Sequence, residues 1–139
     1  MSDETPTLST GLFKGLAPED TNGILEAGER LSFPAGQAIF EAGDTGDAMF
    51  VIADGQARVD VGGRFHIMKP GDFFGEMALL APGPRMATVK AETDVEAVRI
   101  DADAFQAFLL AHPAVALSMM KQLVIRLREV EQRIDAWMA

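Results

Sequence analysis

The fold of this chain is most constrained by the regular alternation of short apolar runs and turn signals between residues 29 and 101. The runs are too short for helices, and turn residues separate them: Pro34-Ala35-Gly36, Gly43-Asp44-Thr45-Gly46, Asp54-Gly55, Gly62-Gly63, Pro70-Gly71-Asp72 and Pro82-Gly83-Pro84. Such spacing is typical of antiparallel sandwiches and barrels. The pattern predicts a mainly β fold, with about eight antiparallel strands in a barrel or jelly roll over about residues 29–101.

One hairpin of this barrel is specified by Gly62-Gly63. A two-residue loop between antiparallel strands needs positive φ, which glycine adopts without steric cost. The predicted register places Val61 opposite Arg64 and Val59 opposite His66. Further clear strand patterns lie at 49–53, 87–91 and 95–100. Other glycines are interpreted as turn residues without a ligand contact: Gly43, Gly46, Gly55 and Gly71.

The N-terminal part of the chain has a different character from the barrel. Residues 1–10 are polar and predict a flexible arm. The run Pro18-Glu19-Asp20 is typical of a helix start, so we expect a short helix within 12–27.

Two further helices are predicted after the barrel. Asp101 or Asp103 caps the first, over 104–111, and Pro113 begins the second. Apolar residues in the second helix recur at steps of three and four: Met120, Leu123, Leu127, Val130, Ile134 and Trp137. This seam of about two and a half heptads docks on the chain's own barrel or pairs with a second copy, or one stripe of the helix meets the barrel while residues 120–137 meet a partner. We favour self-association, which predicts a homodimer through the C-terminal helix.

Length and composition agree with one soluble domain. The chain has 139 residues, and we place the domain at residues 11–139 with the C-terminal helices at about 102–139. No secretory signal and no cysteine are visible, so we expect a cytoplasmic protein without disulfides or thiolate metal sites. A net charge of −9 opposes binding to nucleic acid or to an anionic membrane, and we expect neither as a partner.

The segment at 71–91 interrupts the strands with a glycine, a predicted helical turn and an arginine. Gly75 lets the backbone approach a ligand closely, and the turn over 77–80 presents free N–H groups to an anion. Arg85 supplies a cationic fork for phosphate oxygens, whereas the Glu76 carboxylate suits a hydroxyl donor such as a ribose 2′-hydroxyl. These residues predict a site for a ribose that carries its phosphate close to that hydroxyl.

This segment resembles the phosphate-binding cassette of the cyclic-nucleotide-binding domains in bacterial catabolite activators, cAMP-dependent kinase regulatory subunits and nucleotide-gated channels. The matching residues are Phe74-Gly75-Glu76-Met77-Ala78-Leu79 and Arg85-Met86-Ala87-Thr88-Val89. Phe40-Glu41-Ala42-Gly43-Asp44 and Met49-Phe50-Val51-Ile52 are similar to the family's first hairpins, so the resemblance covers nearly the whole chain. It implies a β-barrel that binds a cyclic nucleotide and has no catalytic activity of its own.

The resemblance also implies a role for individual residues. Glu76 would bind the ribose 2′-hydroxyl and Arg85 the cyclic phosphate, with Ala87 lying against the phosphate. Arg126, counted forward from Arg85 without a gap, falls where related domains place a residue over the purine. Backbone contacts are implied for three neighbours: Gly75, Met77 and Ala78.

The base is specified less directly. Met86 follows the arginine, where cAMP binders of this family usually carry Ala or Ser and many cGMP binders carry Thr. Because methionine has no hydroxyl for guanine, we expect cAMP as the ligand and cGMP as a weaker one. Val59 and His66 either wall the purine pocket or belong to the core and the surface. Arg126 either covers the purine or lies on a solvated helix face.

Other functions have less support in the sequence. A metal-dependent barrel enzyme needs two or three histidines with a carboxylate, and the chain has only His66 and His112, so we expect no catalytic residue, metal or cofactor. No helix-turn-helix follows the long helix, which favours a stand-alone sensor with an unknown effector. Two alternatives stay open: Glu76 and Arg85 form a structural ion pair, or the domain is a degenerate interaction or dimerisation module without nucleotide.

Overall fold

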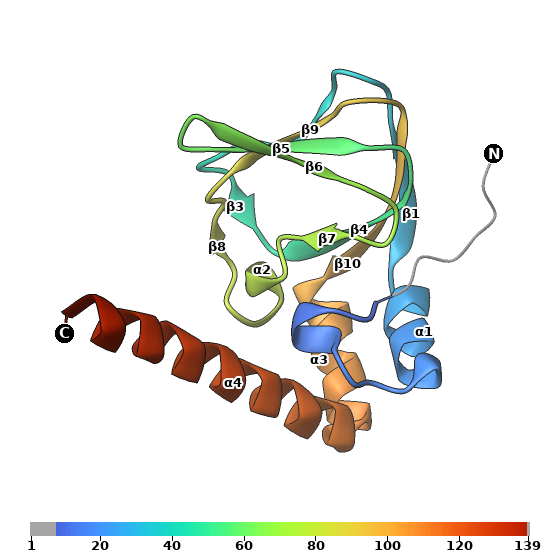
Figure 1. Cartoon of the computed structure of the whole chain (residues 1–139). Helices are drawn as coiled ribbons and strands as arrows, with labels where there is room; N and C mark the ends of the chain where they lie inside the picture. The colour runs from blue at the N-terminus through green and yellow to red at the C-terminus, as the bar shows by residue number, and fades with distance from the viewer. Residues whose placement is uncertain (1–7, 139) are drawn as a thin grey trace.

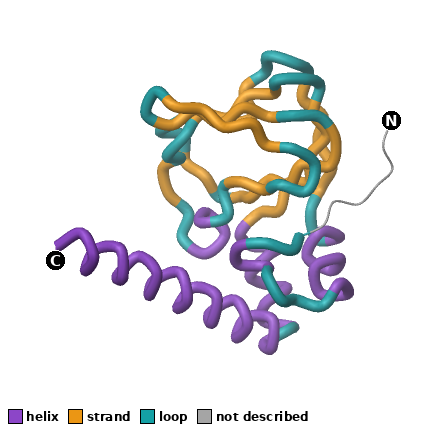
Figure 2. Tube along the Cα trace, in the orientation of Figure 1, coloured by secondary structure: helices purple, strands orange, loops and turns teal. Residues whose placement is uncertain are grey.

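The computed structural model describes residues 8–138 of the chain, and their side chains up to residue 134. Helices precede and follow the β structure along the chain, as predicted, and they gather on one side of it (Figures 1 and 2). The helical elements are η1 (Gly11–Phe13), α1 (Pro18–Glu26), α2 (Met77–Leu80), α3 (Ala102–Ala111) and α4 (Pro113–Met138). The strands are β1 (Glu29–Phe33), β2 (Ala38–Phe40), β3 (Thr45–Gly46), β4 (Ala48–Asp54), β5 (Ala57–Val61), β6 (Arg64–Met68), β7 (Phe73–Phe74), β8 (Gly83–Pro84), β9 (Thr88–Ala91) and β10 (Val95–Asp101).

The strands form two four-stranded sheets and one short ladder, all antiparallel. The first sheet has the order β1-β10-β4-β7, the second β2-β9-β5-β6, and β3 pairs with β8. The mainly β jelly-roll fold with flanking helices is therefore confirmed. Ten strands are described where the sequence predicted about eight, because β3, β7 and β8 contain two residues each and are too short to show an alternating pattern. The β5–β6 hairpin has the predicted register, with Val59 opposite His66 and Val61 opposite Arg64.

Two apolar clusters stabilise this arrangement. On β4, Met49 and Val51 face the cluster between the first sheet and the helices, whereas Phe50 and Ile52 face the cluster between the two sheets. Successive residues of a strand point to opposite faces, so burial on both faces explains why β4 is almost uninterruptedly apolar. The ring of Phe50 stacks on Phe74 at a centroid distance of 5.6 Å.

The predicted N-terminal arm is wrong at Leu8. Residues 1–7 of that arm lie outside the described part of the chain, but the Leu8 side chain is 2% exposed and belongs to the cluster beneath the first sheet. Burying a leucine side chain stabilises a fold by about 1.5–3 kcal/mol, which favours this position of Leu8 even within a polar run.

The C-terminal helices follow the predicted caps. The Asp101 side chain accepts a hydrogen bond from the backbone N–H of Ala104 at 2.7 Å, and α3 begins at Ala102. The axes of α3 and α4 meet at 113° across the break at His112. Within residues 8–138, no single helix has the length and hydrophobicity of a membrane span, and α3 and α4 meet those criteria only as this bent pair.

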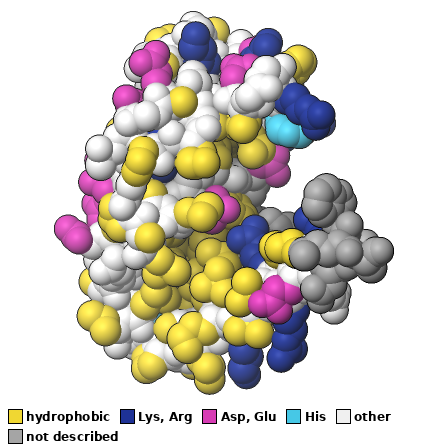
Figure 3. All heavy atoms as spheres, turned by 90° about the vertical axis from the view of Figure 1, so that its left-hand side faces the viewer, with side chains coloured by type: hydrophobic (Ala, Val, Ile, Leu, Met, Phe, Trp, Pro, Cys, Tyr) yellow, Lys and Arg dark blue, Asp and Glu magenta, His cyan; other side chains and the backbone are white. Residues whose placement is uncertain are grey.

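Most of α4 runs beneath the barrel without packing on it (Figure 1). Val115 and Met119 near its start are buried, but the seam residues from Met120 to Ile134 are 38–57% exposed. Figure 3 shows hydrophobic side chains gathered on the lower half of one face of the molecule. Docking of the seam on the chain's own barrel is therefore wrong for residues 120–134. The Trp137 side chain lies outside the described residues.

Candidate functional site

A cavity of about 490 Å³ lies between the second sheet and the segment that carries α2 and Arg85. Its walls are mainly apolar, and strand residues such as Phe40 and Met68 form one side. The structure brings eight of the predicted site residues together around it: Val59, Gly75, Glu76, Met77, Ala78, Arg85, Met86 and Ala87. A concave, mainly apolar space with a few polar groups is the usual character of a small-molecule site.

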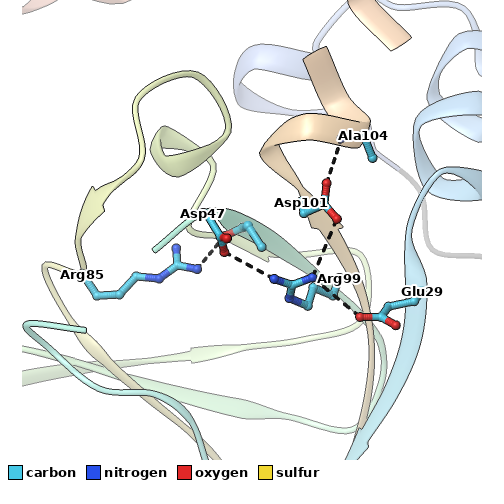
Figure 4. Close-up of polar contacts among 7 residues, drawn as sticks. Glu29, Asp47, Arg85, Arg99, Asp101 and Ala104 are labelled. Carbon is cyan, nitrogen blue, oxygen red and sulfur yellow. Dashed lines mark hydrogen bonds and ion pairs between the residues drawn. The ribbon is translucent and has the colours of Figure 1, made fainter. Parts of the chain in front are cut away.

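The backbone of Arg85 is fixed by the loop that precedes β3. Its N–H donates to the carbonyl of Asp44 at 2.6 Å, and its carbonyl accepts from the N–H of Gly43 at 2.9 Å. The side chain extends toward the segment of Asp47, as Figure 4 shows, and its Nη2 donates to the carbonyl of Ala48 at 2.6 Å. The guanidinium also lies over the ring of Phe40, 4.1 Å from the centroid, which is a favourable cation–π distance.

No carboxylate of the described residues forms an ion pair with Arg85. Asp47, which lies close to it, instead pairs with Arg99 at 3.3 Å, and Arg99 also contacts Glu29 at 3.6 Å and Asp101 at 3.9 Å (Figure 4). Burial lowers the pKa of Arg85 below its ordinary value, and the Asp47 carboxylate offsets part of this effect. A partly desolvated cation without a paired anion favours an anionic ligand in the cavity.

Glu76 lies at the start of α2 and lines the cavity, with its side chain partly exposed. It forms no ion pair with Arg85, so the alternative of a structural pair between them is wrong within the described residues. The turn before α2 has Gly75 at φ 80°, a conformation that favours glycine. The N–H of Ala78 donates to the Gly75 carbonyl at 3.2 Å, so this group is already used within the turn.

Two predicted site residues lie outside the cavity lining. His66 is exposed on β6 and lies opposite Val59 in the β5–β6 hairpin. Because directly paired residues share a face of the sheet, His66 is on the same side of the sheet as the cavity, but it does not line the cavity. Arg126 lies beside η1, with its Nη2 3.8 Å from the position that a Cβ on Gly11 would take. The described structure therefore does not bring Arg126 to the cavity, and its place over a bound purine stays a prediction.

Phe40 is a cavity residue that the sequence pattern did not reveal; with the other phenylalanines it was expected in the core. Phe40 lines the cavity and supports the Arg85 guanidinium, and both facts depend on strand pairing between distant segments. No signal at Phe40 itself distinguishes it from a core residue. Among the described residues, no three His, Asp or Glu side chains converge in a way that could hold a metal ion.

Comparisons with known proteins agree with this geometry. Residues 30–112 match the sequence profile of the cyclic nucleotide-binding domain. The cyclic AMP receptor protein of Thermus thermophilus is 35% identical over 130 residues, which cover 89% of this chain and 60% of that protein. The cAMP-dependent protein kinase regulatory subunit of Aspergillus fumigatus is 39% identical over 110 residues, which cover 77% of this chain and 25% of that protein. The chain thus spans less than two thirds of these relatives.

Solved structures show the same fold. The N-terminal domain of a transcriptional regulator from Streptomyces coelicolor superposes with a TM-score of 0.80 at 27% identity, covering 89% of this chain and 90% of that one. The catabolite activator protein of Thermus thermophilus superposes with a TM-score of 0.72 at 34% identity, covering 92% of this chain and 63% of that one.

Proposed function

The chain belongs to the cyclic nucleotide-binding domain family, and on that premise we propose that its cavity binds a cyclic nucleotide as a regulatory signal, without catalysis. The proposal rests mainly on the environment of Arg85. This residue is a partly buried cation at a mainly apolar cavity, and it has no ion-pair partner among the described residues. A cyclic phosphate supplies the missing negative charge. Its ribose and base fill the mainly apolar remainder of the cavity.

In this proposal different residues around the cavity bind different parts of the nucleotide. The Arg85 guanidinium donates to the exocyclic phosphate oxygens, and Ala87 lies against the phosphate. The Glu76 carboxylate accepts from the ribose 2′-hydroxyl. Gly75 and Met77 contribute backbone contacts, while Ala78 contributes its side chain because its N–H is bonded to the Gly75 carbonyl.

We propose cAMP as the preferred nucleotide, with cGMP weaker. Met86 is 85% exposed at the cavity rim and offers no hydroxyl to guanine. The relatives named for cAMP include a bacterial receptor protein and kinase regulatory subunits, although a cGMP-dependent protein kinase of Toxoplasma gondii is also 40% identical over 85 residues. Val59 and His66 border the base in this arrangement.

The response to the nucleotide passes, we propose, to the C-terminal helices of a domain that spans residues 11–139. The Gln106 side chain of α3 donates to the carbonyl of Leu79 in α2 at 3.1 Å, so the helix at the cavity contacts the element that precedes α4. The exposed seam of α4 then pairs with a second copy. A cytoplasmic homodimer that reports cyclic nucleotide to an effector is consistent with these contacts.

Thermal denaturation with added ligands tests the proposal. A ligand at one hundred times its Kd stabilises the native state by about 2.7 kcal/mol, which raises the Tm of a domain of this size by roughly 10 °C. We expect such a rise with cAMP, a smaller one with cGMP at equal concentration, and little with adenosine 5′-monophosphate, whose phosphate is not held near the 2′-hydroxyl. A folded protein whose Tm responds to neither cyclic nucleotide would support the degenerate interaction module instead.

A further inference from the structure

Gly46, the last residue of β3, lies directly against the side chain of Arg85. A Cβ added to Gly46 would lie 2.5 Å from Cζ and 2.6 Å from Cδ of Arg85. Both distances are shorter than 3.0 Å, below which Cβ contacts essentially never occur in proteins. Gly46 is itself buried, so such a methyl group has no open space on its own side. The Arg85 side chain therefore occupies the volume that any other residue at position 46 would need.

The backbone of Gly46 gives no other reason for glycine at this position. Its φ lies outside the left-handed region, unlike that of Gly43 in the same loop at 91°. The sequence interpretation of Gly46 as a turn residue is therefore wrong, because an alanine could adopt the same backbone conformation. The requirement for glycine here comes from the space that Arg85 takes.

Four groups together define the place of the guanidinium. Gly46 lies along its stem, and a Cβ on Gly75 would lie 2.5 Å from Nη1. The Ala48 carbonyl accepts from Nη2 at 2.6 Å, and the Phe40 ring lies 4.1 Å from Cζ. Two groups attract the guanidinium and two leave room for it, so it is confined to a slot at the cavity wall.

We propose that Gly46 is a positioning residue for the phosphate-binding Arg85, a role that rests on the proposed function. A methyl group at position 46 pushes the guanidinium away from the Ala48 carbonyl and tilts it off Phe40. The N–H groups that face the cavity then no longer meet two phosphate oxygens in the parallel geometry that a bidentate contact needs.

The first test measures the affinity of Gly46→Ala for cAMP by calorimetric titration. We expect a loss of about tenfold or more, the scale of one hydrogen bond to a charged group. Gly83→Ala is the matched variant: Gly83 is the direct partner of Gly46 in the ladder and also lines the cavity, but a Cβ there meets only the Ala81 carbonyl at 3.9 Å and no atom of Arg85. It should lose far less affinity; equal losses for the two variants would overturn the proposal.

The second test uses the Tm of the unliganded protein and does not depend on nucleotide binding. Gly46→Ala should lower the Tm of the wild type, because the methyl group and Arg85 compete for one volume. In an Arg85→Ala background it should leave the Tm unchanged or raise it, since the space is free and alanine restricts the unfolded chain. An equal fall in both backgrounds would show that Gly46 acts without Arg85. A wild type that binds no nucleotide would refute the proposed function but leave this comparison intact.

Discussion

The guanidinium of Arg85 is held by a carbonyl oxygen and an aromatic ring, while the nearby carboxylate of Asp47 is engaged by Arg99. This division leaves the positive charge of Arg85 uncompensated by an ion pair within the described residues. Arginine keeps its proton at neutral pH even though burial lowers the pKa of this side chain. The charge is therefore available to an anion that enters the cavity.

Glu76 is expected to bind the ribose, and this role is separable from phosphate binding. Glu76→Gln keeps an acceptor oxygen but loses the charge, so we expect cAMP to bind about fivefold more weakly, the difference between charged and neutral hydrogen bonds. For 2′-deoxy-cAMP, the wild type and Glu76→Gln should have nearly equal Kd values in calorimetric titration. Glu19→Gln, on the exposed start of α1, serves as the control and should bind as the wild type does.

If Glu76→Gln weakens cAMP and 2′-deoxy-cAMP by the same factor, the carboxylate does not contact the 2′-hydroxyl. The ribose assignment would then be wrong even with Arg85 binding the phosphate.

Single residues of the site were predictable where they are contiguous in the sequence. The cassette from Gly75 to Ala87 carries its own turn, helix start and arginine, so local patterns were sufficient to identify it. Gly46 and Phe40 were not predictable as neighbours of Arg85. Their contacts arise from pairing of β3 with β8 and β2 with β9, which no local pattern specifies.

Among the elements, α4 differs most between expectation and structure. Its apolar spacing and its start at Pro113 were predicted correctly. Its direction was not, because the angle between α3 and α4 depends on how Val115 and Met119 pack into the core rather than on the spacing. Arg126 was expected over the cavity from its distance along the sequence to Arg85, but in this structure it lies beside η1.

The exposed seam of α4 predicts a dimer that one charged residue should disrupt. Leu127→Glu places a carboxylate in the seam and should convert the protein to a monomer in sedimentation velocity at micromolar concentration. Ile125→Glu is the matched control, because Ile125 is similarly exposed but lies off the seam, so this variant should remain dimeric. Each protein is measured with and without cAMP, which should strengthen the dimer if nucleotide fixes the position of α4.

A wild-type protein that sediments as a monomer both with and without cAMP would refute the dimer proposal. Equal dissociation by Leu127→Glu and Ile125→Glu would show that the seam is not the interface.

The net charge of the whole molecule and the charge at the cavity have opposite signs. The net charge of −9 repels anions, whereas the cavity presents a partly buried arginine and mainly apolar walls. The mainly β fold was predictable because its turn signals recur throughout residues 29–101. The division of its core into two clusters was not, since it depends on which face of β4 meets the helices.

The most direct measurement of the central claim is a calorimetric titration of the wild type and of Arg85→Ala with cAMP. We expect saturable binding of one nucleotide per wild-type chain at micromolar concentration or below. Arg85→Ala should show no measurable binding at the same concentrations, because removing the cation leaves a phosphate without a partner in a mainly apolar cavity. Arg30→Ala, on β1 at the opposite edge of the first sheet from β7 and paired with Glu96, should bind as the wild type does. Unchanged affinity in a folded Arg85→Ala, or no heat of binding to the wild type, would show that the cavity does not bind cAMP through Arg85.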